Sequence, residues 1–172
     1  MITGRYLRMM ARYGGWQNGS IHGAASMLDD AARRASRGAF WGSIHGTLSH
    51  LVWADRIWLS RFEQAEKPPV GLAGSATMIE DWDALCAERR ALDATIVAWA
   101  DGFDAGAVGG ELHWYSGAAG REVSAPLGVV LTHFFNHGTH HRGQAHAMIT
   151  AAGGAPADTD LFLMPADAWS GV

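Results

Sequence analysis

Four stretches of the sequence carry an apolar residue at every third or fourth position, and this periodicity limits the fold more than any other feature. The stretches cover residues 6–28, 44–62, 77–99 and 126–152. Such spacing puts the apolar side chains on one face of an α-helix, so each stretch predicts an amphipathic helix. In a chain of 172 residues, four helices of this length predict an all-α fold, a four-helix bundle forming one domain over residues 1–172.

Cap and turn residues predict where the later elements begin and end. Thr77-Met-Ile-Glu80 has the spacing of a capping box, which predicts that the third helix begins there. Pro126 suits the first turn of the fourth helix, and Gly153 can adopt the left-handed backbone that ends it. Before that helix, strand-forming residues at 109–116 and 121–124 flank a turn with two glycines and predict a small β-hairpin.

Composition and charge exclude several classes of function. Hydrophobic residues make up 48% and charged residues 17% of the chain, which is typical of a folded globule rather than a disordered segment. The net charge is −4 and no basic stripe is present, so we expect no nucleic-acid partner. No apolar run approaches the ~20 residues that span a bilayer, so we expect no membrane partner. With Cys86 as the single cysteine and no signal-peptide pattern, we expect a cytoplasmic protein without disulfides.

Histidine is the residue type that stands out, because four of the nine lie within residues 133–141. On a helical wheel, His133, His137 and His141 fall on the face of the fourth helix that should pack inward, and His146 falls opposite. Several buried imidazoles can be satisfied together by one metal ion. A pair at i and i+4 can share an ion, whereas a pair at i and i+8 is about 12 Å apart and cannot. Spacing therefore leaves two alternatives, His133 with His137 or His137 with His141.

A third ligand should come from a neighbouring helix, and the second helix offers His45 and His50. His45 falls among the polar residues of that helix, on the expected solvent face, whereas His50 falls in the apolar arc and is expected to face the core. Asp55, at the edge of the same arc, is expected to support or join the site, or else to pair with an arginine. Three neutral imidazoles suit zinc, nickel, copper or iron(II), and three protein ligands leave a position for water or substrate, as in catalytic sites.

Three stretches of sequence carry a resemblance to a known family. They are Gly46-Thr-Leu-Ser-His50-Leu, Ala54-Asp55-Arg-Ile-Trp58-Leu and Asn136-His137-Gly-Thr-His140-His141-Arg142-Gly143-Gln144. They resemble the DinB/YfiT-like superfamily, most closely its damage-inducible DinB branch of metal-dependent enzymes, and the resemblance covers nearly the whole chain. It implies a bundle with up-down-down-up connections and a long crossover between the second and third helices.

The resemblance also implies a ligand set. The family uses one His from the second helix and a His-x-x-x-His pair from the last, which correspond here to His50, His137 and His141 and to a nickel, zinc or iron ion. His133 then lines the pocket or supports a ligand, and we expect Gln144 to hydrogen-bond to a water at the site. The candidate walls of the pocket are aromatic residues: Trp16, Trp53, Trp58 and Phe134.

These features imply a divalent-metal-dependent enzyme, a transferase or a hydrolase, acting on a small-molecule substrate. Characterised relatives in the wider superfamily transfer low-molecular-weight thiols, such as bacillithiol or mycothiol, to electrophiles. An imidazole-held ion can lower the pKa of a bound thiol or generate hydroxide from water. The alternative is a non-catalytic metal-binding stress-response protein, in which a closed coordination sphere stabilises the bundle. A homodimer is also expected, because relatives often pair and eight tryptophans are many for one small core.

Overall fold

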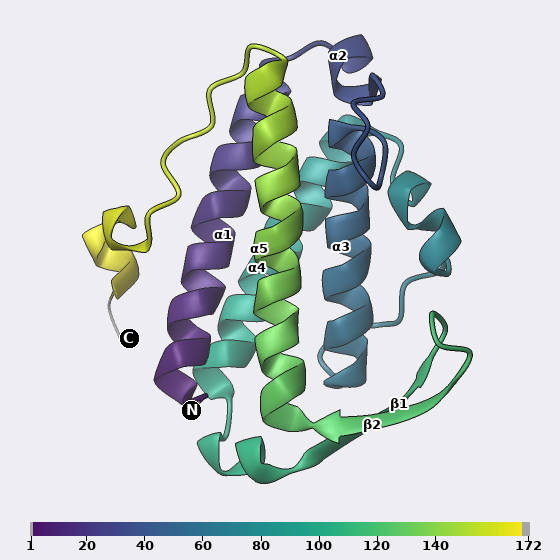
Figure 1. The fold of residues 1–172 in the computed structure, drawn as a ribbon. Coiled ribbons are helices and arrows are strands. Elements are labelled where there is room, and N and C mark those ends of the chain that lie inside the picture. Colours follow the sequence, from purple (N-terminus) through teal and green to yellow (C-terminus); the bar gives the residue numbers. More distant parts are fainter. Residues whose placement is uncertain (1, 170–172) are drawn as a thin grey trace.

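The computed structural model describes residues 2–169, and helices dominate it (Figure 1). Within these residues the long helices are α1 (Gly4–Ser26), α3 (Ile44–Arg61), α4 (Trp82–Gly102) and α5 (Leu127–Ala151). The connections hold the shorter helices α2 (Asp30–Arg34), η1 (Leu72–Thr77) and η2 (Ala105–Gly109), and the C-terminal tail holds η3 (Leu161–Leu163) and η4 (Ala166–Trp169). The prediction of a mostly helical fold with one small two-stranded sheet is confirmed.

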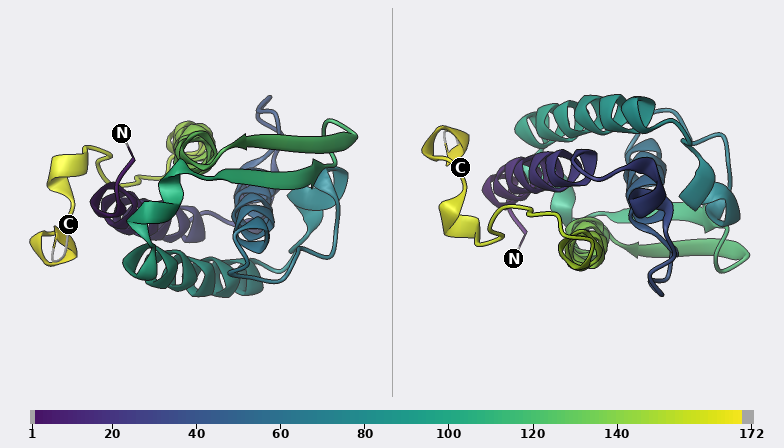
Figure 2. Two further views of the ribbon diagram at one scale, coloured as in Figure 1. Left: turned by 90° about the horizontal axis from the view of Figure 1, so that it is seen from below. Right: turned by 90° about the horizontal axis from the view of Figure 1, so that it is seen from above.

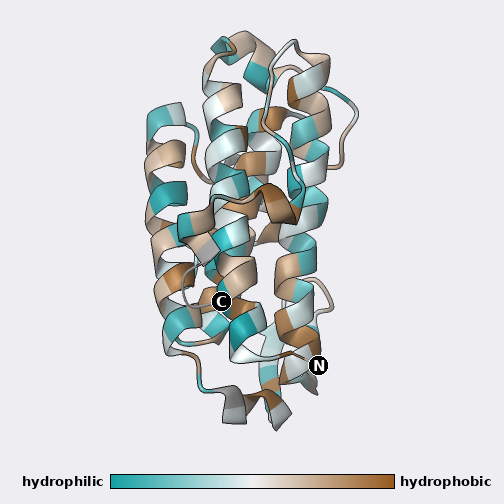
Figure 3. Cartoon of the chain, turned by 90° about the vertical axis from the view of Figure 1, so that its left-hand side faces the viewer, coloured by the Kyte–Doolittle hydropathy of each residue, from teal (hydrophilic) through white to brown (hydrophobic). Residues whose placement is uncertain are grey.

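The long helices pack side by side around a shared hydrophobic core. Helix α1 contacts α4 and α5, and α3 contacts the same two helices, as the end-on views of Figure 2 show. Leu7, Leu48, Leu85 and Leu131 bring one fully buried side chain from each long helix into this core. The hydropathy colouring of Figure 3 shows both hydrophilic and hydrophobic residues on the helices in view, as expected for helices that bury one face.

The predicted start of the third helix at Thr77 is wrong. Helix α4 begins at Trp82, and the carboxylate of its N-cap residue, Asp81, accepts a hydrogen bond from the backbone N–H of Ala84 at 2.7 Å. An Asp carboxylate caps a helix as well as a Thr hydroxyl does, so the sequence is compatible with a helix start at Thr77 or at Asp81. Thr77 instead ends η1, which packs on α3 through the buried Ser75.

The predicted hairpin is present. Strand β1 (Glu111–Ser116) pairs antiparallel with β2 (Arg121–Pro126), and Trp114 lies opposite Val123. Figure 1 shows the hairpin extending from the base of α5 across the lower end of α3. Helix α5 follows directly after Pro126, and after its end Gly153 has φ of 87°, the left-handed conformation predicted there.

The C-terminal tail returns along α1 (Figure 1). The Tyr13 hydroxyl donates a hydrogen bond to the carbonyl oxygen of Thr159 at 2.6 Å, and the Gln17 amide donates to that of Asp158 at 3.0 Å. These bonds fix the tail to a helix that lies far from it in the sequence. Among the described residues, no helix has both the length and the hydropathy that a membrane span requires.

Candidate metal centre

Helices α3 and α5 bring three imidazoles together. His50 lies on α3, and His137 and His141 lie one turn apart on α5, which packs against α3. One ring nitrogen from each of the three side chains lies within 4.8 Å of those of the other two. Their ring centres are 5.4 Å apart for His50 and His137, 4.8 Å for His50 and His141, and 4.5 Å for His137 and His141. We call these residues the three-His cluster; it is the set that the resemblance implies.

The hydrogen bonds of the cluster leave nitrogen lone pairs free for a metal ion. Nδ1 of His141 donates to the amide oxygen of Gln144 at 2.7 Å, so Nε2 of the neutral ring carries a lone pair. Nδ1 of His50 lies 2.9 Å from Oγ of Ser75, while its Nε2 is buried and has no hydrogen-bond partner among the described residues. Leaving a buried ring nitrogen without a partner costs free energy, and a metal ion would remove that cost. The donor set therefore fits a transition metal.

The imidazoles of the cluster are neutral near pH 7. Burial, reinforced by the neighbouring imidazoles, lowers the pKa of His50 to about 3 and that of His137 to about 4. Burial also lowers the pKa of His141, although its hydrogen bond to Gln144 acts in the opposite direction. Because only the neutral ring coordinates a metal, these shifts keep the ligands ready to bind.

Two tryptophans enclose His50. Trp41 stacks on its ring with a centre-to-centre distance of 3.9 Å, and Trp53 stacks at 5.7 Å. Trp53 was among the predicted walls of the pocket. Trp41 was missed because it lies in the loop before α3, outside any helical periodicity. That loop passes so close to α3 that a Cβ on Gly46 would lie 2.5 Å from the carbonyl oxygen of Trp41.

The other predicted residues lie around the cluster or apart from it. His133 is exposed; its ring lies 5.5 Å from His137 and 5.2 Å from Trp58. Gln144 lies beside the cluster, where its amide oxygen accepts from Nδ1 of His141; the expected contact with a water stays a prediction. Two of the predicted walls have other surroundings: Trp16 packs beside Tyr13, and Phe134 lies in the core against Phe62, Trp99 and Phe135.

The prediction that His45 faces solvent is wrong. Its side chain is 3% exposed, and Nε2 lies 2.8 Å from the carbonyl oxygen of Ile79. Ser49, placed on the same polar face by the sequence, is fully buried, and its hydroxyl donates to the carbonyl oxygen of Ser75 at 2.9 Å. The reason is that residues 62–81, which connect α3 to α4, cover this face of α3 and supply backbone acceptors for its polar side chains.

Asp55 pairs with an arginine, one of the two roles expected for it, and lies outside the three-His cluster. Its carboxylate is 2.6 Å from the guanidinium of Arg89, which also lies 2.8 Å from Asp93. Asn18 of α1 donates to the Asp93 carboxylate at 2.8 Å. Burial alone would lower the pKa of Arg89, but the two carboxylates outweigh it and raise that pKa. Arg89 therefore stays charged, and Asp55 is held away from the cluster.

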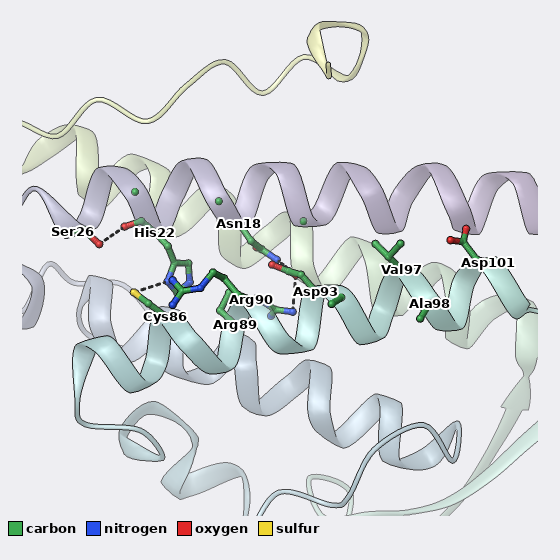
Figure 4. Close-up of a pocket in the computed structure, with 14 residues that line it drawn as sticks. Asn18, His22, Ser26, Cys86, Arg89, Arg90, Asp93, Val97, Ala98 and Asp101 are labelled. Carbon is green, nitrogen blue, oxygen red and sulfur yellow. Dashed lines mark hydrogen bonds and ion pairs between the residues drawn. The ribbon is translucent and has the colours of Figure 1, made fainter. Parts of the chain in front are cut away.

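A hollow of about 740 Å³ opens between α1 and α4, lined by none of the three histidines (Figure 4). Several of its polar side chains contact one another. Sγ of Cys86 lies 3.6 Å from Nδ1 of His22, and Asn18 is bonded to Asp93. Burial raises the pKa of the Cys86 thiol, so this cysteine is not an activated nucleophile. We therefore place the candidate functional site at the three-His cluster and not in this hollow.

Comparison with known proteins identifies the family of the chain. The model of the DinB family matches residues 1–169. No curated protein and no solved structure matches the chain. The family match spans nearly the full length and includes every residue of the three-His cluster. The resemblance seen in the sequence is thereby confirmed, and the chain belongs to the DinB family.

Proposed function

We propose that the protein is an enzyme that uses a divalent transition metal held by His50, His137 and His141. The observation that carries the proposal is the convergence of three neutral imidazoles, each with a nitrogen within 4.8 Å of the other two; Nε2 of His50 is buried and has no partner within residues 2–169. A family match alone would not identify ligands, and a single buried histidine would be explained by packing. The family match together with the three converging imidazoles favours a site that binds a metal ion.

We also propose that the long helices form the up-down-down-up bundle of the family. Two neighbouring helices that run in the same direction need a connection long enough to return from the end of the first helix to the start of the second. Helix α3, from Ile44 to Arg61, is about 27 Å long at 1.5 Å per residue, and residues 62–81 can span that length. This connection supports the proposed order, and it also supplies the serine that contacts His50.

The side chains around the three-His cluster suit acid–base chemistry at a bound metal ion. When bound, the ion would act as a Lewis acid that lowers the pKa of a thiol or a water. Ser75 and Gln144 hold the rings of two ligands, and Trp41 and Trp53 keep water from the ring of His50. Partial desolvation and the positive charge of Arg61 lower the pKa of His133. Its ring is therefore neutral near pH 7, and a ring nitrogen has a lone pair to accept the released proton.

The alternative, a non-catalytic protein in which the metal only stabilises the bundle, needs a further protein ligand to close the coordination sphere. Asp55 was the ligand expected for that role, and Arg89 holds it instead. This favours the enzyme. Thiol transfer and hydrolysis share the same ligand set, so both stay proposals, as does the homodimer, which sedimentation equilibrium can test.

The metal proposal is tested by measuring the metal content of purified wild-type protein and of two variants of α5. We expect about one nickel, zinc or iron ion per wild-type chain, little in His137→Ala, and an unchanged content in His146→Ala, the matched control outside the cluster. Equal losses in both variants, or metal-free wild-type protein that takes up no ion on titration, would refute the site. The metallated protein is then screened against thiol–electrophile pairs and hydrolysable esters, with His50→Ala as the inactive control.

A further inference from the structure

Arg61, the last residue of α3, is a half-buried cation without an acidic partner. Its guanidinium carbon lies 4.2 Å from the ring centre of Trp58 and 5.4 Å from that of Trp114. Among the described residues no carboxylate pairs with it, and no hydrogen bond from its guanidinium is found. Arg56 on the same helix, by contrast, lies 3.1 Å from the Glu88 carboxylate. The surroundings of Arg61 are therefore aromatic and not anionic.

This arrangement leaves the hydrogen-bond donors of Arg61 available. A guanidinium that stacks on an aromatic ring uses its flat face, and its N–H groups stay free in its plane. Burial lowers the pKa of Arg61 to about 10, which still leaves the group charged near neutral pH. An arginine at a helix C-terminus often bonds the last carbonyl oxygens, but no such bond forms among the described residues. A half-buried charge with free in-plane donors is the usual receptor for a carboxylate or a phosphate.

A continuous line of rings joins Arg61 to the three-His cluster. The ring of His133 lies 5.5 Å from that of His137, and the ring of Trp58 lies 5.2 Å from that of His133. Strand β1 closes the far side, where Trp114 packs edge-on against Trp58 at 5.5 Å. Trp58 follows His50 by eight residues on α3, which is about 12 Å along the helix. The cluster and Arg61 thus lie at the two ends of one aromatic strip.

We propose that Arg61, framed by Trp58 and Trp114, binds an oxyanion, a carboxylate or a phosphate, on the molecule whose reacting group lies at the three-His cluster. The substrate is then an elongated organic anion with an apolar or planar middle segment. Its charge lies about 12–16 Å from the reacting atom, because Trp58 and Arg61 follow His50 by eight and eleven residues on the helix. The assignment of Arg61 to a substrate-binding site rests on the proposed metal-dependent function. Binding of the oxyanion itself does not require the metal.

The test measures binding of three small probes to the full chain by tryptophan fluorescence and calorimetry, with and without a chelator. The probes are benzoate, phenyl phosphate and the neutral benzamide. We expect at least one of the two anions to bind, and benzamide to bind at least about tenfold more weakly. Tighter binding of phenyl phosphate identifies a phosphate as the natural group, and tighter binding of benzoate identifies a carboxylate.

Variants of Arg61 and Arg56 distinguish anion binding at Arg61 from anion binding at the metal ion. Arg61→Met should weaken anion binding at least about tenfold, Arg61→Lys should weaken it less, and Arg56→Met, the matched control, should leave it unchanged. Binding that Arg61→Met leaves intact, or that the chelator abolishes, overturns the proposal, because the anion would then bind elsewhere or to the metal. Metal content should be the same in Arg61→Met and the wild type, so failure of one proposal does not imply failure of the other.

Discussion

Polar neighbours orient two of the three rings in the cluster. Gln144 accepts from Nδ1 of His141, which leaves Nε2 of that ring for the metal. Ser75 contacts Nδ1 of His50, and Nε2 of His50 is buried without a hydrogen-bond partner among the described residues. Partners of this kind fix the tautomer and the direction of a ligand ring, and they contribute to affinity without touching the ion. Gln144 comes from the same helix as His141, whereas Ser75 comes from the connection that covers α3.

Replacing Gln144 should therefore weaken metal binding without unfolding the protein. Gln144→Leu removes the acceptor for His141, and we expect metal affinity to fall by about 10- to 100-fold. Gln144→Glu keeps an acceptor at the same place and serves as the control. Competition with a chelating dye measures both affinities; an unchanged affinity in Gln144→Leu would show that the ring of His141 is oriented by packing alone.

The choice between the two histidine pairs shows what the sequence can predict at this scale. Periodicity places His133, His137 and His141 on one face of α5, and it is correct that a pair of them converges with His50. Which pair converges depends on how α5 is positioned along α3. The structure places His141 against His50, while His133 contacts Trp58. That register is a tertiary property, so residue spacing left it open and only the family resemblance supplied it.

The buried His22 should make the free energy of unfolding depend on pH. Burial, followed by the positive charges of Arg89 and Arg90, lowers its pKa from 6.5 to about 3. In the unfolded chain its pKa returns to the normal value, so between these two pH values the unfolded state binds a proton that the folded state excludes. The free energy of unfolding should therefore fall as the pH drops from 6.5 towards 3. His22→Gln should flatten this dependence in urea titrations at about pH 7.5 and about pH 4.5.

Both proteins are measured with a chelator present, so that the histidines of the empty cluster contribute equally to each. The difference between the two pH dependences then isolates His22. If the wild type and His22→Gln lose stability in parallel on acidification, another group is responsible.

At the scale of elements, the connections explain most of what the sequence failed to predict. The long helices follow from apolar periodicity, and the hairpin follows from strand formers around a Gly-containing turn. A helical wheel, however, assumes that any polar face meets water. Residues 62–81 cover the polar face of α3 and bury His45 and Ser49, and the loop before α3 brings Trp41 onto His50. Arg61 was likewise missed, because Trp114, which helps to frame it, lies on the distant β1.

Gly46 tests how tightly that loop and α3 fit. In Gly46→Ala the new Cβ would lie 2.5 Å from the backbone carbonyl oxygen of Trp41, which cannot move without shifting the loop. We expect a loss of about 1–3 kcal/mol in the free energy of unfolding. Gly143→Ala on α5 is the control: nothing lies within 4 Å of its Cβ position, and the better helix former should add about 1 kcal/mol. Urea denaturation measures both; a gain in both variants would contradict the close fit.

At the scale of the whole molecule, a charge network centred on the buried Arg89 joins three of the long helices. Arg89 of α4 is 2% exposed and lies between Asp55 of α3 and Asp93 of α4, and Asp93 accepts from Asn18 of α1. The sequence indicated an arginine as one partner for Asp55, but it could not say which one, because the pairing depends on how α3 and α4 align.

This network should matter more to stability than any surface ion pair. Arg89→Met leaves the buried Asp55 carboxylate, and the partly buried one of Asp93, without their counter-charge. Removing one partner of a buried pair costs about 3–5 kcal/mol. Arg12→Met is the control, because the pair of Arg12 with Asp101 lies at the surface, at 18% and 43% side-chain exposure, and should cost less than about 1 kcal/mol. Both free energies of unfolding come from urea denaturation at neutral pH. A small loss in Arg89→Met would mean that water reaches the carboxylates, and that the alignment of α3 with α4 is set by apolar packing instead of by charge.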